Sequence, residues 1–214
     1  MPSLFKWSGR SDQGPAAVPM APPPVSIPSS TSKVLPRFLA ALAAVPAPVL
    51  LDLGPVVGQN IAFFGEQLAC KIVIEDLHAE IEDHKRRGAD DALPDAIERR
   101  LAREPASIDG IMCWDVFDFL ERRTAQALAT RLVALLRPGG ALYAFFGATA
   151  AELRHYTRYT VEAADTLRLR TTPATPAPRN VFVTRDINRM FDGLVVAESV
   201  LLKSGTRETL FRKP

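Results

Sequence analysis

The stretch Val49-Leu50-Leu51-Asp52-Leu53-Gly54-Pro55-Val56-Val57-Gly58-Gln59-Asn60 decides how the rest of this chain is interpreted. Its apolar run stops at Asp52, passes two glycines, and leads into the apolar Ile61-Ala62-Phe63-Phe64. This order predicts a buried strand, a tight turn and the start of a helix. Glycine lets the backbone approach a ligand closely, and a helix N-terminus offers free N–H groups. The stretch therefore suits a nucleotide, although such turns also occur where no ligand binds.

The glycine spacing excludes two common phosphate-binding loops. No Gly-Lys-Ser/Thr follows, as a P-loop requires, and the pattern is not a complete dinucleotide fingerprint. Farther along, Lys71-Ile72-Val73-Ile74 predicts a second short buried strand, which ends at Glu75 and Asp76. In nucleotide-binding α/β folds, an acid at this place, about twenty residues beyond the glycines, binds the ribose hydroxyls. Adjacent strand residues point to opposite faces, so only one of these two acids can bind a ribose well.

Composition indicates one ordinary globular domain. The chain has 214 residues, 47% of them hydrophobic and 23% charged, and no apolar run reaches the roughly 20 residues of a membrane helix. A formal charge of +2 gives no reason to expect a nucleic-acid partner. Cys70 and Cys113 lie in apolar runs without a ligand-spaced partner, which favours buried free thiols over zinc or a disulfide. We therefore expect a cytoplasmic protein without a metal or a membrane partner.

Residues 1–32 differ in kind from the rest. They are rich in proline, serine, alanine and glycine, with Leu4, Phe5 and Trp7 as the only large apolar groups near the start. Such a segment cannot bury enough surface to offset its ordering entropy, so we expect a disordered arm. The alternative is a segment that folds over a ligand or binds a partner through Phe5 and Trp7. No secretory signal is visible, because polar and charged residues interrupt any apolar core.

Two later stretches complete the predicted sheet. Ile108 to Trp114 predicts a central strand, and Asp115 follows at the carboxyl edge, where open α/β sheets bind ligands. The alternative is that both residues have structural roles, with Trp114 in the core and Asp115 as the cap of the next helix. Residues 125–136 predict a helix, residues 137–140 a turn and residues 141–147 a fifth strand. The tail, at 195–202 and 206–211, predicts an antiparallel hairpin.

These stretches resemble the class I S-adenosylmethionine-dependent methyltransferases, in particular the type 11-like domain. Residues 52–58 resemble the family's acidic glycine loop, with Val56 in place of the middle glycine. The acids at 75 and 76, the block around Trp114, and the string Leu135-Leu136-Arg137-Pro138-Gly139-Gly140-Ala141-Leu142 follow in the family's order. The resemblance covers about residues 49 to 147. It implies a Rossmann-like α/β fold, doubly wound with a mostly parallel sheet, helices on both faces and a C-terminal antiparallel hairpin.

The resemblance also implies a function and a set of site residues. The implied activity is methyl transfer from S-adenosylmethionine to an unidentified small-molecule acceptor. The implied cofactor-binding residues are Asp52, Gly54, Gly58, Glu75, Asp76, Asp91 and Trp114. The family's strand-end pattern favours Asp76 over Glu75 for the ribose. His155 and Asp115 are the candidate bases, the first by pKa and the second by position.

Two regions depart from or extend the family pattern. Residues 88–94 resemble the stretch with which the family leaves its third strand, where Asp90 or Asp91 would meet the adenine, but the preceding strand is missing from the pattern. Residues 148–183 hold His155, Tyr156, Arg158 and Tyr159 and are expected to cover the acceptor site, where they could hold an anionic or aromatic acceptor. The alternative is an exposed hairpin whose tyrosines pack on the sheet.

Two rival functions remain open. The domain could be an inactive methyltransferase-like binding or scaffold module, which the loss of a glycine at Val56 and the missing third strand favour. It could also be a nicotinamide-dependent reductase, although such an enzyme would be expected to have a glycine pattern closer to Gly-x-Gly-x-x-Gly.

Overall fold

The computed structural model describes residues 28–214, so most of the predicted arm lies outside the described residues. Its last residues are folded, which corrects the predicted boundary at residue 32. Strand β1 (Ser29–Thr31) pairs with a later strand, and the Ser32 hydroxyl accepts a hydrogen bond of 2.7 Å from the Leu35 N–H at the start of α1 (Leu35–Ala43). The Ser32 hydroxyl also donates to the buried carboxylate of Glu208. The ordered domain therefore includes residues that composition alone assigned to the arm.

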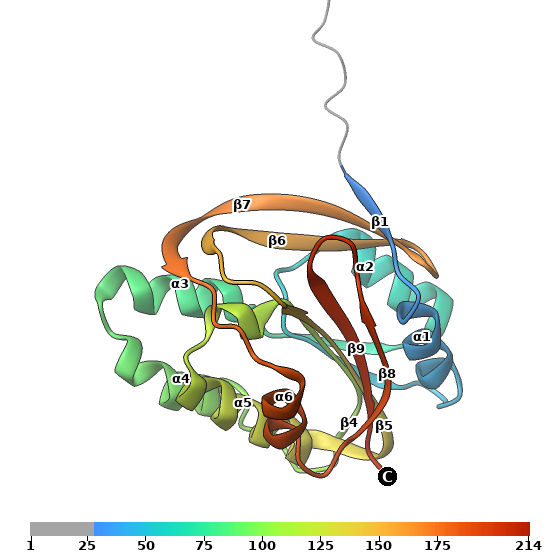
Figure 1. The fold of residues 1–214 in the computed structure, drawn as a ribbon. Coiled ribbons are helices and arrows are strands. Elements are labelled where there is room, and N and C mark those ends of the chain that lie inside the picture. Colours follow the sequence, from blue (N-terminus) through green and yellow to red (C-terminus); the bar gives the residue numbers. More distant parts are fainter. Residues whose placement is uncertain (1–27) are drawn as a thin grey trace, which may run out of the picture.

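A six-stranded sheet forms the centre of the molecule (Figure 1). Its order is β3 (Lys71–Ile74), β2 (Val49–Asp52), β4 (Ile108–Trp114), β5 (Leu136–Gly147), β9 (Thr206–Arg212) and β8 (Val195–Leu201). The first four strands are parallel, and β9 runs antiparallel to both of its neighbours. The predicted fold class, a doubly wound, mostly parallel sheet with a C-terminal antiparallel hairpin, is confirmed.

Helices cover both faces of this sheet because alternate strand residues point to opposite sides. Leu51, Ile111 and Leu142 belong to the core under the first group of helices, whereas Leu50 and Met112 belong to the core on the other face. The first group comprises α3 (Leu77–Arg87), α4 (Leu93–Arg100), α5 (Arg122–Leu135) and α6 (Thr184–Met190). The other face is covered by α1 and by α2 (Gly58–Ala62), which continues as the π-helical turn η1 (Phe63–Gln67). No helix in residues 28–214 has the length and apolar character to cross a membrane.

The missing third strand is a real feature of the fold. Between β3 and β4 the described chain forms α3, the short 3-10 helix η2 (Asp90–Ala92) and α4, with no strand between them. Strand β3 is therefore an edge of the sheet.

A second sheet of three strands lies across the carboxyl ends of β4 and β5. It consists of β1, β7 (Thr166–Pro178) and β6 (Glu152–Ala163), and the long β6–β7 hairpin arches over the molecule in Figure 1. Two side chains attach this hairpin to helices. The Asn60 amide donates to the Tyr159 carbonyl (2.9 Å) and accepts from the Val161 N–H (2.8 Å). Glu82 of α3 accepts from the Thr175 N–H (2.9 Å), so the hairpin is held at both ends.

Candidate functional site

The turn after β2 lies at the point where the strand order of the sheet reverses. Strand β3 is added on one side of β2, and β4 lies on the other side. Open α/β sheets bind ligands at such a point. Asp52 shapes this turn, because one oxygen of its carboxylate accepts from the Gly54 N–H (2.9 Å) and from the indole N–H of Trp114 (2.7 Å). The carboxylate is buried, and burial raises the pKa of Asp52 to about 6. Both hydrogen bonds of Asp52 described here therefore go to groups of the protein itself, the glycine turn and Trp114.

Trp114 lies directly against Gly54. A Cβ added at Gly54 would come within 2.7 Å of Cδ1 and 2.8 Å of Nε1 of the indole. A shift in the β4–β5 register between Met112 and Trp114 accompanies this position, and Trp114 has a φ of 49°, an uncommon conformation for a bulky residue. Tyr159 of the hairpin stacks on the indole with ring centroids 5.0 Å apart and planes 4° apart. The space beside the first glycine is therefore filled by the protein's own aromatic rings.

The side chains of the two acids after β3 point in different directions, as expected for adjacent residues. Asp76 is the N-cap of α3, where its carboxylate accepts from the Ala79 N–H (3.0 Å), and it lines a cavity together with Pro55 of the glycine turn. Glu75 turns toward α4 and pairs with Arg100 (3.2 Å) and with Arg103 (2.8 Å). Asp76 is thus the acid on the side of the glycine turn.

The cavity beside the glycine turn is small. The cavity beside Asp76 and Pro55 measures about 180 Å³, whereas small-molecule sites span roughly 300–1,000 Å³. The Trp114 ring lies against Gly54 on the side to which a Cβ would point. A ligand larger than this cavity would bind here only if the side chains around it move.

Three other residues were assigned to the site from the sequence. Two of them line neither cavity, and the third, Gly58, has room for a side chain. A Cβ at Gly58, the first residue of α2, would meet nothing within 4 Å. Asp91 is exposed in η2 and lines neither the cavity at Asp76 nor the larger one described below. His155 is exposed on β6 and also lines neither cavity. Of the two alternative candidate bases, His155 therefore lies outside both cavities, whereas Asp115 lines the larger one.

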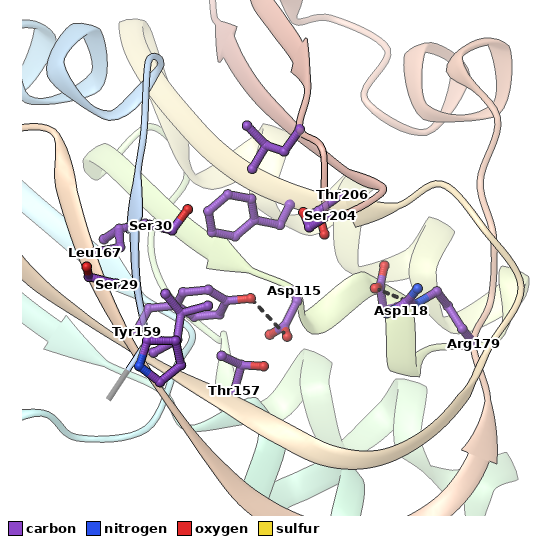
Figure 2. Close-up of a pocket in the computed structure, with 14 residues that line it drawn as sticks. Ser29, Ser30, Asp115, Asp118, Thr157, Tyr159, Leu167, Arg179, Ser204 and Thr206 are labelled. Atoms are coloured by element: carbon purple, nitrogen blue, oxygen red, sulfur yellow. Dashed lines mark hydrogen bonds and ion pairs between the residues drawn. The ribbon is translucent and has the colours of Figure 1, made fainter. Parts of the chain in front are cut away.

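A larger cavity, of about 300 Å³, opens at the carboxyl ends of β4 and β5 (Figure 2). Ser29 and Ser30 of β1 lie on one side of it, and Ser204 and Thr206 at the β8–β9 turn lie on another. The remaining lining is mostly apolar and aromatic, together with two acids and one arginine: Pro28, Asp115, Asp118, Phe145, Thr157, Tyr159, Leu167, Leu169, Arg179 and Leu202. Strand β1, the hairpin and the C-terminal strands line this part-open cavity.

Asp115 lines this cavity. One of its oxygens accepts from the Tyr159 hydroxyl (3.2 Å), and the other lies 3.3 Å from Nε2 of His78, without hydrogen-bond geometry. His78 is 4% exposed, and neither ring nitrogen has a hydrogen-bond partner. His78 also lines the cavity beside Asp76, so the His78–Asp115 contact lies between the two cavities. Sequence reasoning missed His78, although its place two residues after Asp76 was a usable signal.

Asp118 is a second buried acid that the sequence did not single out. It follows β4 in the 3-10 helix η3 (Val116–Phe119), accepts from the Gly147 N–H (2.8 Å) and lies 3.0 Å from Nε of Arg179. Burial raises the pKa of Asp118 to about 7, with the nearby charge of Asp115 adding to the rise. Among residues 28–214 no group of three or more His, Cys, Asp or Glu side chains is arranged to hold a metal ion.

We expect the domain to lose stability as the pH rises through neutrality. A carboxyl whose pKa is higher in the folded than in the unfolded state favours folding when protonated, so its contribution is complete below about pH 4 and is lost as the pH rises through 7. Between pH 5 and pH 8 this should lower the free energy of unfolding by on the order of 2 kcal/mol. Urea denaturation across this range measures the effect.

The control for this prediction is Asp118→Asn, which keeps an oxygen for the Gly147 N–H but cannot ionise. It should remove the share of the slope that Asp118 contributes between about pH 4 and 7, while the share of Asp52, whose pKa is about 6, should remain between about pH 4 and 6. An unchanged slope in Asp118→Asn would contradict the assignment.

Comparisons with known proteins give distant likenesses to solved structures. No family model matches the chain. No curated protein matches it either. A Pyrococcus horikoshii protein, PH0226, is 15% identical over 79% of this chain and 83% of its own, with a TM-score of 0.48. The Burkholderia thailandensis 1,6-didemethyltoxoflavin-N1-methyltransferase, solved with S-adenosylhomocysteine, is 17% identical over 85% of this chain and 77% of its own, with a TM-score of 0.47. The CcbJ methyltransferase of Streptomyces caelestis is 13% identical over 91% and 97%, with a TM-score of 0.46.

Because these sequence identities are low, the similarities do not assign an activity. The order and direction of the strands define the fold. The glycine turn follows β2 at the switch point, and antiparallel β9 lies between β5 and β8. The fold is of the Rossmann-like methyltransferase type.

Proposed function

We propose that this protein transfers a methyl group from S-adenosylmethionine to a small-molecule acceptor. The observation that carries the proposal is that the Asp52–Gly54 turn and Asp76 lie at the ends of adjacent strands, at the switch point of this sheet, where Asp76 and Pro55 line one cavity. The cofactor would supply an activated methyl group. The protein's own part is to orient the acceptor, exclude water and remove a proton where the acceptor requires it.

The proposed division of the site follows the two cavities. The cofactor side is the glycine turn with Asp76, and the acceptor side is the cavity under the β6–β7 hairpin. Asp115 lines the acceptor side, and His78 lies within 3.3 Å of it. Both are groups that can hold a proton near a bound acceptor. Of the two candidate bases, Asp115 therefore remains the proposed one, with His78 as its neighbour.

A second candidate function is a binding module of the same fold without methyl transfer. The position of Trp114 favours it, because an indole held by Asp52, Tyr159 and the chain at Gly54 fills the cofactor side. The difference between the two candidates is whether that ring leaves when the cofactor is present.

Isothermal titration of the full-length protein with S-adenosylmethionine, S-adenosylhomocysteine and NADH separates these functions. Methyl transfer predicts binding of the first two, with S-adenosylhomocysteine at micromolar or tighter dissociation constants, and none of NADH. Binding of NADH alone would favour a reductase. Binding of none of the three would reject the methyl-transfer proposal and leave the binding module.

A further inference from the structure

The cavity under the hairpin has an uneven balance of charge. Three ionisable groups other than tyrosine line it: Asp115, Asp118 and Arg179. Arg179 lies 3.0 Å from Asp118, which offsets the charge of Arg179 when it is ionised. No lysine or arginine in residues 28–214 forms an ion pair with Asp115, and His78 contacts it without hydrogen-bond geometry. The cavity therefore has one uncompensated acid.

Asp115 also has unused capacity to accept hydrogen bonds. The residue is 9% exposed, and only one of its oxygens has a hydrogen-bond donor, the Tyr159 hydroxyl. A buried carboxylate is stabilised by several donors or by a cation, and an oxygen left without either carries a desolvation cost. Figure 2 shows this carboxylate among the side chains that surround the cavity.

The walls around Asp115 are apolar and aromatic. Phe145 and Tyr159 present rings, and Leu167, Leu169 and Leu202 complete the apolar lining. Aromatic faces attract cations as well as flat apolar groups. The volume of about 300 Å³ is at the lower end of small-molecule sites, which limits the ligand to a compact body.

We propose that this cavity binds a small molecule that carries a protonated amine on a flat apolar body, with the amine at Asp115 and the body against Phe145 and Tyr159. As the identity of the methyl acceptor, this inference rests on the proposed function. As a binding site for an amine, the cavity does not depend on the proposed function. An anionic acceptor, which the clustered residues 155–159 suggested, does not suit this cavity, because its one arginine is already paired with Asp118.

The test uses three ligands that share a phenol ring and differ in charge. Tyramine carries an amine, 4-ethylphenol is neutral and 4-hydroxyphenylacetate carries a carboxylate. Isothermal titration of the full-length protein at pH 7.5, without any cofactor, should give tyramine a dissociation constant at least about tenfold below those of the other two. Equal or tighter binding of 4-hydroxyphenylacetate would overturn the proposal.

Variants then locate the binding. Asp115→Asn should remove the advantage of tyramine over 4-ethylphenol, whereas Asp192→Asn, which changes an exposed acid outside the cavity, should leave it intact. Leu202→Trp narrows the cavity without changing its charge and should weaken tyramine and 4-ethylphenol alike. Circular dichroism first establishes that each variant is folded. Unchanged tyramine binding in both Asp115→Asn and Leu202→Trp would overturn the proposal.

Failure of this inference is distinguishable from failure of the proposed function. Tyramine binding in a protein that binds no S-adenosylmethionine would support the site and reject methyl transfer. S-adenosylmethionine binding without any preference for tyramine would reject the amine ligand and leave methyl transfer standing.

Discussion

Replacing Trp114 with alanine should lower the free energy of unfolding by about 3–5 kcal/mol, the usual cost of deleting a large buried aromatic side chain. Trp114 is 2% exposed, stacks on Tyr159 and donates to Asp52 at 2.7 Å. The alanine would leave a cavity and remove one of the two donors to a buried carboxylate. Guanidinium denaturation followed by circular dichroism measures the loss.

The two glycines of the turn provide a matched control. Gly54→Ala should destabilise the protein, because its Cβ would lie 2.7 Å from the Trp114 ring, whereas Gly58→Ala adds a Cβ that meets nothing within 4 Å. In the Trp114→Ala background the cost of Gly54→Ala should largely disappear, since the clashing ring is gone. A cost that persisted there would show that Trp114 is not what fills this space.

The same variant tests the role of Trp114 in ligand binding. If the ring must leave Gly54 before S-adenosylhomocysteine can bind, Trp114→Ala removes that step and the dissociation constant should fall. A higher dissociation constant would instead support the sequence-based assignment of Trp114 as a residue that contacts the cofactor.

Replacing Asp76 with alanine should weaken S-adenosylhomocysteine binding roughly 10- to 100-fold, whereas Glu75→Ala should cost clearly less. A carboxylate that accepts hydrogen bonds from ribose hydroxyls contributes about 1.5–3 kcal/mol to binding. Asp76 lines the cavity at the glycine turn, while Glu75 is occupied by Arg100 and Arg103 on the other side. The measurement is a dissociation constant for each variant after circular dichroism has established folding.

The helix cap at Asp76 requires its own control. Asp76→Ala also removes the N-cap of α3, at a typical cost of about 1 kcal/mol in stability. Asp76→Ser keeps a capping oxygen but is too short to act as the carboxylate does, so it should weaken binding while preserving the melting temperature. If Glu75→Ala is the more damaging change, the two acids have exchanged roles. If neither changes binding, Asp76 holds no cofactor and the binding module becomes the better proposal.

Local patterns predicted most of the main sheet. The apolar runs at 49–52 and 108–114 form β2 and β4, and the helix-breaking Pro138-Gly139-Gly140 lies at the start of β5, directly after α5. The tail hairpin at β8 and β9 also follows its predicted bounds closely. These elements are predictable because burial, helix breaking and turn formation depend mainly on neighbouring residues.

Contacts between distant residues decided the site. The sequence alone determined the sheet, its glycine turn and the acids at its carboxyl edge. Only the tertiary structure placed Trp114 on Gly54, attached β6 to α2 through Asn60, and set His78 beside Asp115. Residues 60 and 161 are 101 positions apart, and periodicity shows that a residue is buried without showing what it is buried against. Whether the glycine turn is open to a ligand depends on such long-range packing, which is why the fold was predictable and the filled cofactor side was not.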